Sequence, residues 1–184
     1  MSRGRNIIAL DIGNVCVSIH PERVVARLNV VPTPEVLAVC ARLECGLISE
    51  ADWLAYFHEQ TQHRFSAEQL ISIWNSSLGN PIPGMEEALK DVLARGYSFV
   101  YLSDISSFHW TEFQRKCPFC HLALDGVFSF DAGVQKPDEK IFLEFERRHG
   151  KPCVYFDDRL NNIETARCLG WNAVPFRSVA DFVL

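Results

Sequence analysis

The chain has 184 residues and a mass of 20.9 kDa, which suits one domain or one core domain with a modest insertion. Apolar residues make up 48% and charged residues 22%, the composition of a globular protein that buries a core. Lysine and arginine number 18 against 23 aspartates and glutamates, so the net charge is −5. This balance argues against nucleic acid as a main partner, because phosphate backbones attract basic surfaces.

The sequence also argues against a membrane or secreted protein. No segment approaches the roughly 20 apolar residues of a membrane span, and the apolar run after Asn6 ends at Asp11, too soon for a secretion signal. The seven cysteines are odd in number and lie mostly in apolar patterns, as reduced and packed thiols do. We therefore expect a soluble, unprocessed, cytoplasmic protein without a disulfide framework.

Short apolar runs alternate with segments of helical periodicity along most of the chain. The clearest helix has apolar residues at Met85, Leu89, Val92 and Leu93 and ends near Gly96. This alternation predicts an α/β protein with a doubly wound parallel sheet, whose ligands bind at the carboxyl ends of the strands. The five predicted strands are Ile7 to Leu10, Ser98 to Leu102, Val127 to Phe130, Cys153 to Phe156 and Asn172 to Phe176.

The alternation of strands and helices is interrupted at residues 18–80, which contain helical patterns and no convincing strand. Three helix starts are specified by N-cap signals: Thr33 before a proline, Ser49 with Asp52, and Ser66 with Gln69. We interpret this stretch as a small helical cap inserted after the first strand. Residues 1–17 and 81–184 are then predicted to form the α/β core domain.

Four sequence elements place reactive groups at predicted strand ends or helix starts. Asp11 ends the first strand, Ser103 ends the second, and Lys136 precedes a proline at an expected helix start. Asp157 and Asp158 form the fourth element; adjacent carboxylates repel, so this pair suggests a bound cation. Taken singly, the first three elements have ordinary alternatives: a turn aspartate for Asp11, a helix N-cap or turn residue for Ser103, and a solvated loop charge for Lys136.

In this order, the four elements resemble the four motifs of the haloacid dehalogenase-like (HAD) hydrolase superfamily. The insertion between the first two motifs is similar in position and size to the small helical C1 cap of that superfamily. The first motif, Asp-x-Gly-Asn-Val, resembles that of a branch of small-cap phosphatases. The most specific matches are Lys136-Pro137 and Asp157-Asp158-x-x-x-Asn162, followed by Ile163, Ala166 and Gly170.

The resemblance implies a Mg2+-dependent phosphatase that acts through an aspartyl-phosphate on Asp11. Ser103 would donate to a phosphate oxygen, and Lys136 would offset the negative charge of carboxylates and phosphate. The helix that starts near Ser106 would direct its N-terminus at the same anion. The implied Mg2+ ligands are Asp11, the backbone carbonyl of Gly13 and Asp158. Asp157 would lie next to the ion as a further metal-site residue, and Asn162 would contact the ligands and not the ion itself.

Two residues depart from the usual motifs of the superfamily. Gly13 stands where most of these phosphatases have the aspartate that protonates the leaving oxygen. Asp104 follows the serine where asparagine is common, and a carboxylate there would disfavour a phosphate unless it points away or serves as the acid. Without a dedicated acid, the rate should depend steeply on the pKa of the leaving group.

Other residues are weaker candidates. Asn14, Asp104 and His20 are considered as substrate contacts, while the cap aromatics, such as Trp74, fit a cap core better than a binding surface. Cys117-Pro118-Phe119-Cys120 has the spacing of a redox motif, but it lacks the strand-to-helix context and the partners of a zinc site.

The leading functional hypothesis is therefore a phosphatase for a small phosphorylated metabolite, working as a monomer or small homo-oligomer. The alternative is a HAD-fold binding or regulatory protein with weak turnover, which Gly13 and Asp104 favour. A haloacid dehalogenase uses the same nucleophile without a metal. It ranks lowest, because it leaves Asp157 and Asp158 without a cation.

Overall fold

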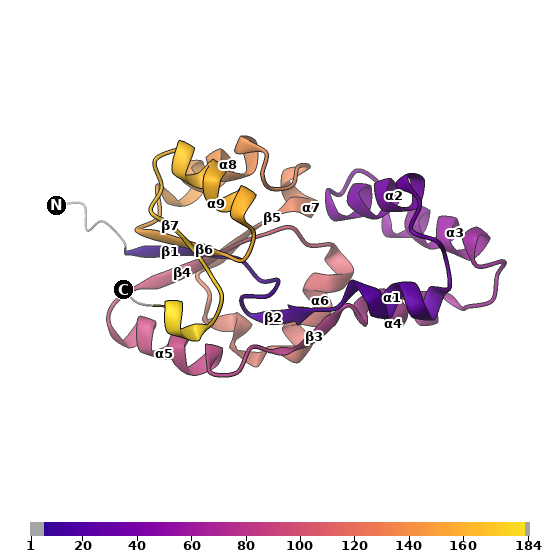
Figure 1. Cartoon of the computed structure of the whole chain (residues 1–184), viewed down its shortest axis with the longest axis horizontal. Helices are drawn as coiled ribbons and strands as arrows, with labels where there is room; N and C mark the ends of the chain where they lie inside the picture. The colour runs from indigo at the N-terminus through magenta and orange to yellow at the C-terminus, as the bar shows by residue number, and fades with distance from the viewer. Residues whose placement is uncertain (1–5, 183–184) are drawn as a thin grey trace.

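The computed structural model describes residues 6–182 and has a parallel five-stranded sheet at its centre (Figure 1). The strand order is β5-β4-β1-β6-β7, so β1 lies in the middle and every neighbouring pair runs parallel. The predicted α/β fold class is confirmed, and so are its five core strands. Their bounds are Ile7–Leu10 (β1), Ser98–Ser103 (β4), Asp125–Phe128 (β5), Val154–Asp157 (β6) and Ala173–Pro175 (β7).

The third core strand lies earlier in the chain than the sequence indicated. It covers Asp125–Phe128, whereas Phe130 belongs to the short helix α7, Ser129–Ala132. The 3-10 helix η1 (Pro118–Leu122) precedes it, and η2 (Val179–Asp181) follows the last strand.

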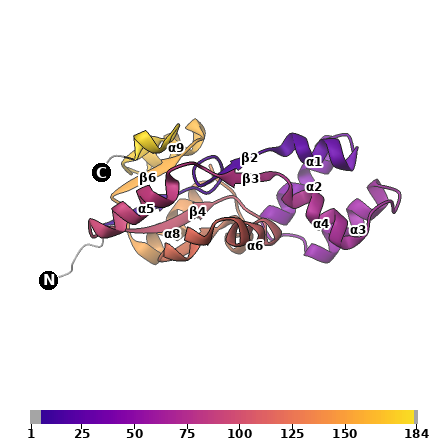
Figure 2. The same ribbon diagram turned by 90° about the horizontal axis from the view of Figure 1, so that it is seen from below.

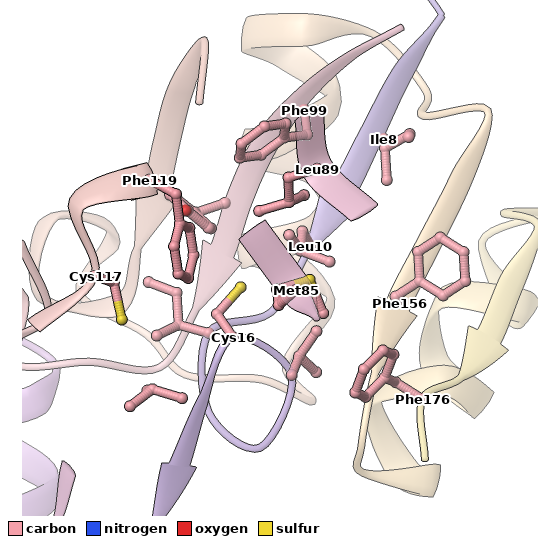
Figure 3. Packing of buried hydrophobic residues seen from close by; sticks show 14 of the residues in the cluster. Ile8, Leu10, Cys16, Met85, Leu89, Phe99, Cys117, Phe119, Phe156 and Phe176 are labelled. Carbon is pink, nitrogen blue, oxygen red and sulfur yellow. The ribbon is translucent and has the colours of Figure 1, made fainter. Parts of the chain in front are cut away.

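Helices cover both faces of the sheet because alternate strand residues point to opposite sides. Ile8 and Leu10 pack on the side of α5 and α6, whereas Ile7 and Ala9 pack on the side of α8 and α9. Figure 3 shows the first of these cores, with Met85 and Leu89 of α5 against the sheet. The helices are Met85–Ala94 (α5), Ser107–Lys116 (α6), Glu139–His149 (α8) and Leu160–Cys168 (α9).

Four of the five helices between β1 and β4, α1 to α4, lie to one side of the sheet, and we call them the cap (Figures 1 and 2). The structure corrects one prediction here: the stretch contains two short strands, β2 (Val17–Ile19) and β3 (Leu78–Pro81), paired antiparallel. The glycine, asparagine and proline of β3 are poor strand formers, and β2 has only three residues, too few to give a clear pattern. The helices are Pro21–Leu28 (α1), Pro34–Glu44 (α2), Glu50–Gln60 (α3) and Ala67–Asn75 (α4).

The N-cap signals of the cap helices are confirmed. The Thr33 hydroxyl accepts the Val36 N–H at the start of α2, and the two other starts form complete capping boxes. In the core, α5 ends as predicted, with Gly96 at φ 85° just after its C-cap residue. Nearby residues satisfy the backbone groups at these helix ends, so the starts of α2, α3 and α4 and the end of α5 are encoded locally.

The cap packs directly on the core. Its aromatic centre, Trp53, lies 5.8 Å from the ring of Phe108 in α6. The Trp74 indole N–H donates to Ser106 Oγ at 3.2 Å, and Ser107 Oγ donates to Glu50 at 2.6 Å. These contacts hold the cap over the carboxyl ends of the strands.

Candidate active site

The candidate site lies at the carboxyl ends of the three central strands. Asp11 directly follows β1, Ser103 is the last residue of β4, and Asp157 is the last residue of β6. Because β1 is hydrogen-bonded between β4 and β6, these side chains are brought to one edge from distant parts of the sequence. This is the switch point at which open α/β sheets bind ligands.

Lys136 is the centre of the charge network. Its ammonium lies 3.0 Å from Asp11 Oδ1 and 2.7 Å from Asp157 Oδ2, and it donates to the Leu102 carbonyl at 2.8 Å. The side chain is 1% exposed, so it is not the solvated loop charge that its sequence context suggests when read alone. Burial alone would lower the pKa of Lys136, but Asp11 and Asp157 outweigh burial and raise it.

The helix after this loop starts later than predicted. Asp138 is its N-cap and α8 begins at Glu139, so Pro137 lies before the helix and not in its first turn. The Lys136–Pro137 peptide bond is cis.

Asp157 is fully buried and its oxygens are saturated by donors. Oδ2 accepts hydrogen bonds from the Lys136 ammonium and the Tyr155 hydroxyl, and Oδ1 accepts one from the Arg159 backbone N–H at 2.8 Å. The Asn162 side-chain amide donates to both oxygens, at 3.0 and 3.1 Å. Burial alone would raise the pKa of Asp157, but these partners, with Lys136 foremost, hold it below its usual value. Such a carboxylate stays ionised and orients its neighbours.

The pKa of Asp11 is governed by burial more than by its ion pair with Lys136. Burial raises the pKa of this carboxyl to about 7, even though the ammonium of Lys136 acts in the opposite direction. Asp157 and Asp104 add to the increase by repulsion. The site therefore holds more negative charge than Lys136 balances, and an added cation would favour the ionised form of Asp11.

Asp158 extends the acidic cluster towards solvent. Carboxylate oxygens of Asp11, Asp157 and Asp158 all lie within 4.8 Å of one another. Asn14 Nδ2 donates to Asp158 Oδ2 at 2.9 Å, while Asn14 Oδ1 accepts the Ile19 N–H at 3.0 Å. Asn14 thus lies against a carboxylate of the cluster, with both ends of its amide engaged.

The two departures from the motifs have distinct environments. Asp104 Oδ1 accepts the backbone N–H of Lys136 at 2.8 Å, and Arg159 lies 4.0 Å from its other oxygen. Burial raises the pKa of Asp104, with Lys136 opposing this effect. Gly13 lines the same cavity and carries no side chain that could donate a proton.

Some candidates lie elsewhere. His20 is not among the residues that line the cavity; its ring nitrogens contact Ser18 at 3.0 Å and Glu22 at 3.2 Å. Among the cap aromatics, Phe57 and Trp74 line the cavity, whereas Trp53 lies in the cap core.

The cysteine pair has no redox environment. Cys117 directly follows α6 and is buried. Burial raises the pKa of its thiol to about 12, so the thiol stays protonated. Cys120 also has a raised pKa, again through burial. Both thiols are free in the structure.

A cavity of about 480 Å³ lies between the strand ends and the cap. Glu44 of α2 and Gln135 of the core are among the polar residues that line it and that the motif comparison did not identify. Gln135 Nε2 donates to Glu44 at 2.7 Å, and burial raises the pKa of Glu44 to about 7. Glu44 ends an amphipathic cap helix, so no local pattern marks it as a site residue.

Solved structures show the same architecture. A HAD family enzyme from Bacteroides thetaiotaomicron has a TM-score of 0.84 at 20% identity, over 96% of this chain and 95% of that chain. The fold is that of the HAD-like hydrolases. The wild-type enzyme in complex with magnesium and inorganic phosphate has a TM-score of 0.80 at 20% identity, over 95% and 96% of the two chains.

Two further HAD-like neighbours extend the comparison. A predicted HAD-like family hydrolase from Porphyromonas gingivalis has a TM-score of 0.79 at 18% identity, over 94% of this chain and 91% of that chain. An L-2-haloacid dehalogenase from Xanthobacter autotrophicus has a TM-score of 0.65 at 9% identity, over 93% and 77%. No family model matches the chain. Among residues 6–182, no helix has the length and apolar character needed to cross a membrane.

Proposed function

We propose that this HAD-fold protein is a Mg2+-dependent phosphatase acting on a small phosphorylated molecule. The observation that carries the proposal is the buried arrangement at the strand ends, in which Asp11 lies 3.0 Å from Lys136 and beside Asp158. Phosphoryl transfer needs an aligned nucleophile and neutralisation of spread negative charge, and this arrangement offers both. We further propose that residues 1–17 and 81–184 form the catalytic core domain and residues 18–80 its cap.

The donor set fits Mg2+. Asp11 and Asp158 offer clustered carboxylate oxygens, the hard ligands that this ion prefers, and the Gly13 carbonyl lies on the same loop. Asp157 belongs to the cluster, but its oxygens already accept hydrogen bonds from four groups, so we assign it the role of holding Lys136. The ion would neutralise phosphate charge and help position the phosphoryl group.

The chain's own residues account for the transfer. A carboxylate oxygen of Asp11 attacks phosphorus, and the bond from phosphorus to the ester oxygen breaks with its electron pair on the leaving oxygen. That oxygen takes a proton from water and departs as the alcohol. Water then attacks the aspartyl-phosphate, which releases phosphate and restores Asp11. Ser103 donates to a phosphoryl oxygen, and the ammonium of Lys136 offsets the negative charge of the phosphoryl group, in both steps.

Particular residues bear on two other functions, a binding or regulatory protein and a haloacid dehalogenase. Gly13 favours a binding or regulatory protein with weak turnover, since it leaves the proton donor to solvent. The dehalogenase neighbour shares the fold, but a metal-free reaction at Asp11 would leave the clustered Asp158 without a counter-charge. The acidic cluster therefore favours the phosphatase.

The test is turnover of p-nitrophenyl phosphate by the full chain with Mg2+ or with EDTA. We expect activity that EDTA removes and that Asp11→Asn abolishes, while Asp91→Asn, a change at an exposed position of α5, leaves it unchanged. Calorimetric titration with Mg2+ provides a readout without substrate. Full turnover in EDTA, or by the Asp11→Asn variant, would refute the proposal. Mg2+ binding without turnover would favour the regulatory alternative.

A further inference from the structure

The cavity above the site has two chemically different parts. At the strand ends it is lined by polar groups, including Asp11, Ser103 and Asp158. Everywhere else most of its lining is apolar and comes from the cap. The apolar residues include Val24 and Leu28 of α1, Val36 and Leu37 of α2, Phe57 of α3 and Trp74 of α4.

The polar groups away from the strand ends already have partners. Gln135 donates to Glu44 at 2.7 Å, and His109 Nε2 lies 3.0 Å from Ser77 Oγ and 3.1 Å from the Trp74 carbonyl. Burial lowers the pKa of His109 to about 4, so its ring is neutral. A ligand with several hydroxyls would therefore find few open hydrogen-bonding partners and would lose hydration on entry.

The charge of the cavity also restricts its ligands. Among the described residues that line it, Arg159 is the only lysine or arginine, and its side chain is 63% exposed. Glu44 and Asp104 line the same space and are acidic groups with raised pKa values, mainly through burial. A second phosphate, as in a nucleotide or a sugar bisphosphate, would lack a cationic partner here.

The apolar lining continues to the surface between α1 and α2. Val25 and Leu37 line the cavity and are 43% and 56% exposed. Val30 and Pro32 line the cavity too, and Val31, which lies between them in the sequence, is 74% exposed. A hydrocarbon chain longer than the cavity could thus extend along an apolar path to solvent, whereas a polar chain would be poorly matched.

We propose that the substrate is an amphiphilic phosphate monoester, with its phosphate at Asp11 and a hydrocarbon-rich alcohol against the cap. This inference rests on the proposed phosphatase function and specifies its leaving group. The reaction is the hydrolysis described above, with the hydrophobic alcohol as product.

The experiment is a series of primary n-alkyl phosphates from ethyl to decyl, assayed by phosphate release with Mg2+. Their leaving groups have nearly equal pKa values, so chain length changes binding and not the intrinsic chemistry. We expect kcat/KM to rise roughly fourfold per methylene until the cavity is filled. Glycerol 3-phosphate and glucose 6-phosphate, polar esters, should fall well below octyl phosphate. A flat series or a preference for the polar esters overturns the proposal, even if p-nitrophenyl phosphate is hydrolysed.

Binding is measured separately from turnover with the Asp11→Asn variant and octylphosphonate in a calorimeter. Ethyl-, butyl- and hexylphosphonate are titrated in the same way, and the expected result is an affinity that rises with chain length, with a negative heat-capacity change, the sign of apolar burial. Chain-length-independent affinity overturns the proposal. Chain-length-dependent binding by a wild-type protein that hydrolyses no ester would retain the apolar site and refute the phosphatase function, so the two failures are distinguishable.

Two exposed leucines of the cap provide a matched pair of variants. Leu37 lines the cavity, whereas Leu47, 60% exposed, does not. Leu37→Gln should lower kcat/KM about tenfold for octyl phosphate and much less for ethyl phosphate, and Leu47→Gln should change neither. If Leu37→Gln instead converts a dimer to a monomer in sedimentation and leaves the series unaltered, the apolar path is an interface between two copies and the proposal is wrong.

Discussion

Gly13→Asp tests what the missing proton donor does to the reaction. The structure permits the substitution, because Gly13 does not have a positive φ. A Cβ there would meet Ile19 Cγ1 at 3.2 Å, and this side chain needs to move by only a few tenths of an ångström. The new carboxyl would join the acidic cluster of Asp11 and Asp158, whose repulsion raises its pKa in the direction that suits an acid.

General acid catalysis contributes about 10²–10⁴-fold, and more where the leaving oxygen is more basic. We therefore expect Gly13→Asp to raise kcat/KM for alkyl phosphates by about 10²-fold and for p-nitrophenyl phosphate by less than about threefold. The assay plots log kcat/KM against leaving-group pKa for aryl and alkyl esters. The slope should be steep for the wild type and shallower for the variant.

Gly13→Asn is the matched control, since it has the same size and no proton of suitable acidity. It should keep the wild-type slope. Circular dichroism and Mg2+ titration establish that both variants fold and bind the ion. Equal slopes for the wild type and a folded, Mg2+-binding Gly13→Asp would refute the reasoning, because protonation would then be supplied elsewhere, with Asp104 as the first candidate.

Two further predictions follow from the charge network. Lys136→Met should lower kcat/KM on the order of 100-fold or more and, by leaving Asp11 and Asp157 unpaired, lower the unfolding free energy by about 3–5 kcal/mol in urea titrations; unchanged stability would contradict the buried contacts. Glu44→Gln addresses a carboxyl whose pKa is raised from 4.5 to about 7, mainly by burial. The unfolded chain loses this proton first, so wild-type stability should fall between pH 5 and pH 8, by roughly 1–3 kcal/mol more than in the variant. Equal pH profiles in thermal melts would contradict this.

The sequence predicted the parts of the fold that local rules determine. Ser49 with Asp52 and Ser66 with Gln69 specify helix starts through contacts within four residues, and both capping boxes are present. The core strand beginning at Ile7 is continuously apolar because both faces of the sheet are covered, and this pattern is visible without tertiary information.

Features that depend on tertiary contacts were missed or misplaced. The antiparallel pair β2 and β3 joins segments about 60 residues apart; β2 is only three residues long, and β3 contains poor strand formers. The site role of Lys136 was predicted from the family resemblance and not from its own sequence context, which indicates a loop charge; its contacts with Asp11, Asp157 and the Leu102 carbonyl exist only in the folded chain. Glu44 reaches the site because the cap packs against the core, which no spacing in the sequence records.

Asp104 shows how a residue that looks unfavourable in the motif gains a role in three dimensions. A carboxylate beside a phosphate is repulsive, yet one oxygen of Asp104 accepts the backbone N–H of Lys136 and so fixes the loop that carries the ammonium. The other oxygen of Asp104 lies 4.0 Å from Arg159, and burial raises the pKa of the Asp104 carboxyl. Both effects reduce the repulsion between Asp104 and a bound phosphate. Gly13 has no such compensation. If the protein is the phosphatase we propose, we therefore expect the absent proton donor, and not the additional carboxylate, to decide whether its turnover is efficient or weak.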